Sequence, residues 1–176
     1  MRTHNGLVSQ SKSMLESLKK QFRQKTFLAY LAIVRIFVGY HFIRVSWGKV
    51  SGTFLSGEAL PRMLANVTDD PFLWHQDFLS GVVIPNPVFF SYLVAFGELA
   101  IGISLVLGCL VRVSSLFGAF HNLNIYLAIG IPQGGAVLGL NRLFIVCLLV
   151  FAVAGAGRAL GVDAILKRKF FRSWLF

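Results

Sequence analysis

The chain has 176 residues, of which 56% are hydrophobic, and its mean hydropathy is +0.70. A soluble domain of this size cannot bury so much apolar side chain, so the composition excludes a soluble globular protein and indicates an integral membrane protein. Basic residues outnumber acidic ones by 17 to 7, and most of them lie in residues 1–25 and 158–172, on either side of the apolar part. This distribution is typical of positive-inside anchoring on an anionic leaflet and argues against a nucleic-acid partner.

The first 26 residues are polar and basic. Within them, the stretch "SKSMLESLKKQFRQK" places Met14, Leu15, Leu18 and Phe22 at helical spacing among lysines. This spacing predicts a basic amphipathic helix on the cytoplasmic surface of the membrane. The alternative is a disordered basic tail.

Four apolar segments follow, each about as long as a ~30 Å hydrocarbon core requires. They cover about residues 27–47, 88–110, 113–131 and 136–157. The connection 48–87 carries two basic and four acidic residues, whereas Arg112 lies in the short turn between the second and third segments. The charge pattern therefore predicts that both termini and this turn are cytoplasmic and that residues 48–87 and 132–135 lie outside.

The long connection contains helix signals of its own. In "DDPFLWHQDFLSG", Asp70 is a candidate N-cap, Pro71 suits the first helical position, and Gly81 suits the end of the helix. A second short helix is expected around residues 56–66. The predicted fold is therefore an all-α membrane bundle of four helices with a short helical cap between the first and second. The tail 158–176 mixes cations with aromatic residues, which is typical of a second interfacial anchor.

Polar residues inside the apolar segments are the candidates for function. Glu98 lies about 15 Å from the outer edge of its span, and Arg35 lies about 12 Å from the inner edge of its own, at ~1.5 Å per residue. A carboxylate at this depth must be paired, protonated or hydrated. We therefore expect an intramembrane polar cluster that consists of Arg35, Glu98, Arg142, His121 and Asn122.

Two interpretations of this cluster remain open. It is either an ion pair that fixes the register of the helices, or a site for a proton or a ligand. Two arginines around one glutamate leave positive charge, which suits a small anion or a quinone carbonyl.

Other residue patterns limit the cofactors. Cys109 and Cys147 lie in apolar segments without a CxxC motif, so neither a thiol relay nor a metal site is predicted. His41 and His121 are expected at different depths, which argues against a haem ligated by both. Arg44 is expected to reach the headgroups at the outer edge of the first span.

Three stretches carry a family resemblance: "VRIFVGYHFIRVSWGKV" (34–50), "PNPVFFSYLVAFGELAIGISLVLGCLVR" (85–112) and "AGAGRALGVDAIL" (154–166). In this order they resemble the DoxX and DoxD group of small four-span membrane proteins over roughly residues 27–166. The likeness is closer to the DoxD type, the small subunit of thiosulfate:quinone oxidoreductase. The motif positions are occupied here by Arg35, Lys49, Glu98, Arg112, Arg158 and Asp163.

The resemblance implies a four-helix bundle in a bacterial or archaeal cytoplasmic membrane, and a partner subunit with which electrons are passed to quinone. It supplies no catalytic residue set. Four of the matching positions, and Arg44 as well, are expected to be structural or anchoring: Lys49, Arg112, Arg158 and Asp163.

Two functions fit the sequence: a membrane subunit of a quinone-linked redox complex, or a structural or assembly subunit of a larger membrane complex. Whether the chain is itself an enzyme stays open, because it carries no haem pair, cysteine cluster or dinucleotide-binding loop. A small-solute transporter is disfavoured by the lack of inverted repeats.

Overall fold

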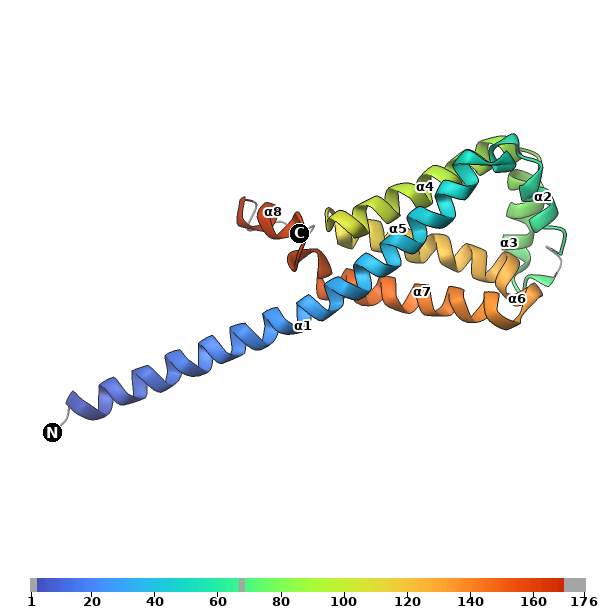
Figure 1. Cartoon of the computed structure of the whole chain (residues 1–176). Helices are drawn as coiled ribbons and strands as arrows, with labels where there is room; N and C mark the ends of the chain where they lie inside the picture. Colours follow the sequence, from blue (N-terminus) through green and yellow to red (C-terminus); the bar gives the residue numbers. More distant parts are fainter. Residues whose placement is uncertain (1–2, 67–68, 170–176) are drawn as a thin grey trace.

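The computed structural model describes the backbone of residues 3–66 and 69–169 and the side chains of residues 27–66 and 69–167. Throughout these residues the regular elements are helical, which confirms the all-α prediction. The long helices are α1 (Thr3–Ser51), α4 (Pro87–Leu107), α5 (Val111–Ile125) and α7 (Gly135–Ala154) (Figure 1).

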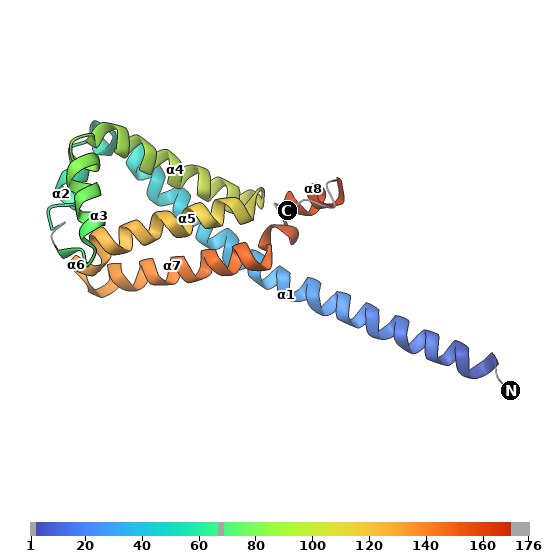
Figure 2. The ribbon, with the colours of Figure 1, turned by 180° about the vertical axis from the view of Figure 1, so that it is seen from behind.

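Short elements connect the long helices. Between α1 and α4 lie η1 (Thr53–Ser56), α2 (Ala59–Met63), α3 (Leu73–Phe78) and the π-helical turn η3 (Leu79–Val83). Between α5 and α7 lie the π-helical turn η4 (Tyr126–Gly130) and α6 (Ile131–Gln133). After α7 come η5 (Ala156–Arg158) and α8 (Asp163–Lys169). Figures 1 and 2 show α2, α3 and α6 at one end of the packed helices, here called the α2–α3 end, and α8 at the other, here called the α8 end.

Three helical segments are long and apolar enough to cross a membrane: Phe27–Ser51, Pro87–Leu107 and Gly135–Ala154. They correspond to three of the four predicted spans. Large apolar side chains such as Phe37, Phe89 and Val153 are exposed on them, as expected for contact with a lipid bilayer. The remaining predicted span, 113–131, is occupied by α5, η4 and the start of α6.

The packing of α1 against α4 depends on two glycines. A Cβ atom added to Gly39 would lie 2.9 Å from the carbonyl oxygen of Gly102, and one added to Gly102 would lie 2.9 Å from that of Gly39. The two backbones therefore touch, as is common where small residues line the interface of membrane helices. This contact fixes the register of the two helices.

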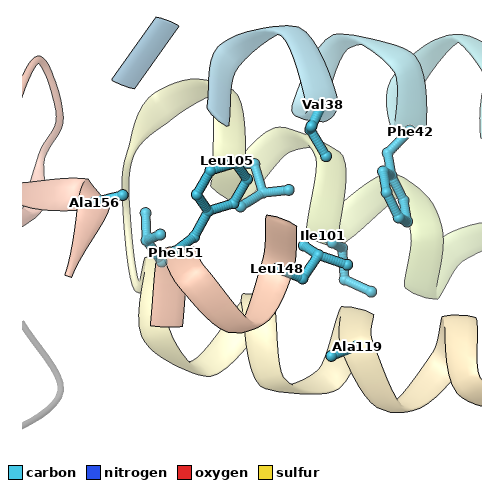
Figure 3. Close-up of a cluster of buried hydrophobic side chains, with 9 residues drawn as sticks. Val38, Phe42, Ile101, Leu105, Ala119, Leu148, Phe151 and Ala156 are labelled. Carbon is cyan, nitrogen blue, oxygen red and sulfur yellow. The ribbon is translucent and has the colours of Figure 1, made fainter. Parts of the chain in front are cut away.

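The interior contains two apolar clusters. The first lies among α1, α4, α5 and α7, where the side chains in Figure 3 converge; Leu105 and Leu148 in it are completely buried. The second lies at the α2–α3 end, where Phe54, Leu60 and Leu79 pack against the long helices. The short elements are thus held to the bundle by their own apolar side chains.

Both ends of the chain were expected to contact the membrane surface. Residues 3–26 form the N-terminal part of α1, which extends beyond the other helices (Figures 1 and 2). Their side chains, on which the amphipathic prediction depends, lie outside the described residues. The aromatic residues of the predicted anchor, 170–176, lie outside them as well.

Candidate intramembrane polar site

Glu98 lies near the middle of α4 and is paired with two residues from other helices. Lys49 of α1 donates from its Nζ to both carboxylate oxygens, at 2.6 Å each. His121 of α5 places its Nε2 2.9 Å from Oε1 of Glu98. These three residues are called the Glu98 cluster below, and they join α1, α4 and α5.

The directions of the helices explain this meeting. The chain reverses between α4 and α5 in a tight turn, with Gly108 and Leu110 in left-handed conformation. Glu98 precedes this turn by about ten residues and His121 follows it by about eleven, so both lie ~15 Å from it. Lys49 lies in the last turn of α1, and its long aliphatic stem carries the ammonium group toward the centre of α4.

The cluster is accessible through two of its members. The side chain of Glu98 is 6% exposed, against 18% for Lys49 and 20% for His121. The ammonium group of Lys49 also lies 5.3 Å from the centre of the Phe54 ring, a cation–π contact. A molecule approaching the cluster therefore meets Lys49 and His121 before it meets the carboxylate.

The hydrogen bonds constrain the protonation of His121. An ionised carboxylate only accepts hydrogen bonds, so Nε2 of His121 must carry the hydrogen that faces Glu98. Among residues 27–66 and 69–167, Nδ1 of the same ring has no hydrogen-bond partner. In neutral His121, Nδ1 is therefore a proton acceptor directed away from Glu98.

Arg35, the predicted partner of Glu98, lies elsewhere. It is completely buried at the α8 end, where its Nη2 donates to the carbonyl oxygen of Leu160 at 3.0 Å. A Cβ atom on Gly161 would lie 2.8 Å from Nη1 of this guanidinium group. The Gly39–Gly102 contact sets a register in which Arg35 meets the end of α4, whereas depths counted from the span edges had placed it beside Glu98. The structure therefore corrects this pairing.

The remaining predicted members of the cluster are also separate from Glu98. Arg142 is exposed, lies 5.5 Å from the centre of the Tyr126 ring, and donates to the hydroxyl of Tyr126 at 3.2 Å. Asn122 is buried and donates to the carbonyl oxygen of Gly118, one turn earlier in α5. Of the five predicted residues, the structure brings together Glu98 and His121. Lys49, rather than Arg35 or Arg142, supplies the positive charge beside Glu98.

Asp163 organises the α8 end. Its buried carboxylate accepts hydrogen bonds from the backbone N–H groups of Leu110 at 2.7 Å and Val111 at 3.0 Å, at the N-terminus of α5. The same carboxylate interacts electrostatically with Arg35 and Arg112. The carboxylate thus accepts hydrogen bonds at the N-terminus of α5, where helices favour negative charge.

Sequence reasoning missed a second buried polar group. His75 of α3 contacts the carboxylate of Asp70 through Nδ1 and lies 3.1 Å from Oδ1 of Asn124 through Nε2. It is completely buried and ties α3 to α5. Asp70 had been predicted as an N-cap, but α3 begins only at Leu73, because the carboxylate is directed at His75 and at the N–H of Phe72.

The described residues offer little for metal or disulfide chemistry. Cys109 and Cys147 are free thiols. Among residues that the structure describes, no group of three histidine, cysteine or acidic side chains could hold a metal ion.

Several apolar helices of membrane-spanning length, with a partly buried ion pair between two of them, define a multi-pass membrane protein. The DoxX family model matches residues 30–131, and the chain belongs to the DoxX family. The matched range includes all three members of the Glu98 cluster. Searches of curated proteins and of solved structures found no match. The resemblance to the family is thereby confirmed, while the closer likeness to the DoxD type stays a prediction.

Proposed function

We propose that this protein is a membrane subunit of a quinone-linked redox complex and that the Glu98 cluster binds the quinone head group. The observation that carries the proposal is a carboxylate held near the middle of an apolar helix by two partly exposed groups that carry protons. Ionisable residues at such a depth are expensive to bury and commonly mark functional sites.

The chemistry of a quinone suits these three side chains. Reduction to the quinol adds two electrons and two protons, and the protons go to the two carbonyl oxygens. Lys49 can donate a hydrogen bond to a carbonyl oxygen and stabilise the negative charge that develops there. His121 can carry a proton on Nδ1 and pass it to one carbonyl oxygen, while the other carbonyl oxygen takes its proton from water. Glu98 orients both groups and compensates their charge. The electrons come from a partner subunit, as the family resemblance implies.

A small anion is the other ligand that the cluster could take. Lys49 supplies a positive charge, and protonation of His121 adds a second against the single carboxylate. The quinone is preferred because the cluster lies among apolar helices, where a hydrophobic quinone can arrive from the bilayer.

The proposal includes four membrane spans. α5 and η4 have 15 and 5 residues and follow one another without a break, which gives a length of about 30 Å. Two polar side chains of α5 have partners inside the bundle: His121 contacts Glu98, and Asn122 donates to the backbone. Both termini would then lie in the cytoplasm of a bacterium or archaeon, and α2 and α3 would form a cap outside the membrane. The concentration of basic residues near both ends supports this orientation.

The alternative is a structural or assembly subunit without a ligand of its own. The observation that favours it is that Lys49 binds both oxygens of Glu98, so the carboxylate is already satisfied and joins three helices. In that case the cluster serves only to fix the arrangement of α1, α4 and α5.

Gentle purification followed by extraction and chromatography of bound quinone tests the proposal. The wild-type protein should carry quinone close to a 1:1 ratio, and Glu98→Gln should carry several-fold less at normal expression. Glu58→Gln, which changes an exposed carboxylate at the α2–α3 end, is the matched control and should behave as wild type. Stoichiometric partner subunits without quinone would favour the structural alternative.

A further inference from the structure

The helix α3 and the turn η3 that follows it carry apolar side chains both toward the bundle and away from it. Leu79 and Val83 are buried in the apolar cluster at the α2–α3 end. In contrast, the side chains of Leu73 and Trp74 are 74% and 66% exposed, and Phe78 is exposed as well. Large apolar side chains that gather on an exposed surface mark a contact with lipid or with another protein.

Aromatic ring contacts join this surface to α4. Phe78 packs edge-on against Phe90, with ring centroids 6.2 Å apart, and Phe90 packs edge-on against Phe89 at 5.3 Å. Phe89 is exposed in the first turn of α4, a helix long and apolar enough to cross a membrane. Trp74 lies four residues before Phe78 and therefore on the same side of α3. The exposed apolar side chains of α3 thus continue into the lipid-facing surface of α4.

The start of α4 sets the depth at which α3 lies. α4 has 21 residues, so it spans about 30 Å, and its first residue, Pro87, lies at the edge of the hydrocarbon core. Residues 84–86 alone separate η3 from α4, and Figures 1 and 2 show α3 at this end of the packed helices. α3 is therefore placed at the level of the lipid headgroups. Tryptophan is enriched at this level, because its ring is apolar and its N–H is polar.

The charge of this segment favours a contact made by apolar side chains. Residues 69–86 contain three aspartates and no lysine or arginine, so they do not attract anionic headgroups. Two of the aspartates, Asp69 and Asp77, are exposed and can stay in water. Continuity with a surface that faces lipid favours the bilayer over a protein partner as the occupant of the exposed side of α3.

We infer that α3 and η3 form an interfacial anchor, whose exposed apolar side chains insert into the headgroup region of the bilayer. Leu73, Trp74 and Phe78 make this contact, while Leu79 and Val83 hold the same segment to the bundle. The cap then rests on the membrane surface at the α2–α3 end. The anchor is separate from the Glu98 cluster and does not depend on the proposed redox role.

Fluorescence quenching of Trp74 in vesicles tests the anchor. Trp47→Phe with Trp174→Phe leaves Trp74 as the only tryptophan of the chain. This variant is reconstituted into phosphatidylcholine whose acyl chains carry bromine either next to the headgroup or near the chain end. Bromine next to the headgroup should quench Trp74 roughly twice as strongly as bromine near the chain end, because the ring lies at the interface. Acrylamide in the water should quench it weakly, and added phosphatidylglycerol should not change the result.

A tryptophan at position 56 is the matched control. Ser56 is exposed at the same end of the molecule, in η1, and is polar. In a chain that also carries Trp47→Phe, Trp74→Phe and Trp174→Phe, the tryptophan of Ser56→Trp should be quenched strongly by acrylamide and weakly by both brominated lipids. Equal quenching of the two positions by bromine next to the headgroup would overturn the anchor.

Photo-crosslinking of the unmodified protein gives a second readout that needs no substitution. Phosphatidylcholine with a diazirine next to the headgroup should label residues 72–78 several-fold more than residues 53–58, as measured by mass spectrometry of peptides. Quenching of Trp74 by acrylamide and by neither lipid would place α3 in water, and protection from all three quenchers would show that protein covers it. Stronger quenching by bromine near the chain end would place it in the hydrocarbon core. Each of these results would overturn the proposal.

Discussion

The carboxylate of Glu98 lies in an apolar setting, where Lys49 and His121 contact it from two neighbouring helices. Removing one partner of a buried pair leaves an uncompensated charge, which typically costs about 3–5 kcal/mol. Replacing both partners with apolar residues of similar size is often close to neutral. A single substitution therefore tests how much the pair contributes to stability, whereas a double apolar substitution removes the charged groups at little cost in stability and so tests their function.

Lys49→Met is expected to lower the free energy of unfolding by about 3–5 kcal/mol, because it leaves Glu98 buried and unpaired by an ammonium group. Lys49→Met combined with Glu98→Leu should recover most of that loss. Unfolding in mixed micelles, followed by circular dichroism, measures both values. The matched control is the exposed pair Arg62→Met with Glu58→Leu, which should change stability by less than about 1 kcal/mol. A Lys49→Met protein as stable as the wild type would contradict the pairing.

Sequence reasoning located part of the site. Glu98 and His121 were predicted because a charged or polar residue inside an apolar segment is visible in the sequence. Lys49 was expected to be an anchor, because it lies at the end of its apolar segment. In the structure its long aliphatic side chain extends to Glu98, and the sequence does not show this direction. Arg35 was misplaced because depth along a helix does not determine which residues of two helices meet.

Among the elements, hydropathy and length located three apolar helices within a few residues, since a bilayer sets both properties. The first helix extends to Ser51 rather than to residue 47, which is why Lys49 belongs to α1. The π-helical turns η3 and η4 carry no comparable sequence signal. The register of α1 against α4 comes from the close approach of Gly39 and Gly102, a tertiary contact.

Gly102→Ala should separate α1 from α4, because its added Cβ would lie 2.8 Å from the Ile43 side chain and 2.9 Å from the Gly39 carbonyl oxygen. We expect a loss of about 2 kcal/mol or more, as for overpacking in a core. Gly97→Ala, in the same helix, is the control: its Cβ would meet no atom within 4 Å, and alanine favours the helix. Thermal unfolding of both variants measures the difference. Equal melting temperatures would argue against the close contact.

At the scale of the whole molecule, the family assignment and the apolar helices establish a multi-pass membrane protein. The proposed four-span arrangement depends on α5, whose polar side chains make its sequence less apolar than those of α4 and α7. His121 contacts Glu98, and Ser115 is completely buried. These two polar side chains of α5 therefore face the interior of the bundle.

Cysteine labelling in intact cells tests the number of spans. In a background with Cys109→Ala and Cys147→Ala, single cysteines are placed at the exposed positions Ser56 and Gln133 and, near the N-terminus, at Ser9. If α5 crosses the membrane, an impermeant maleimide should label Ser56→Cys and Gln133→Cys from outside and Ser9→Cys only after permeabilisation. Labelling of Ser56→Cys and Gln133→Cys from opposite sides would show that α5 does not cross.

A ligand site and a purely structural contact at the Glu98 cluster differ in what its removal changes. Quinone binding and thermal unfolding can be measured on the same nanodisc samples of the wild type and of Lys49→Met with Glu98→Leu. If the cluster binds quinone, the double variant should unfold near the wild-type temperature yet bind quinone at least about tenfold more weakly, as expected for the loss of a charge-assisted hydrogen bond. A double variant that is equally stable and binds quinone as tightly as the wild type would contradict a ligand site at this cluster.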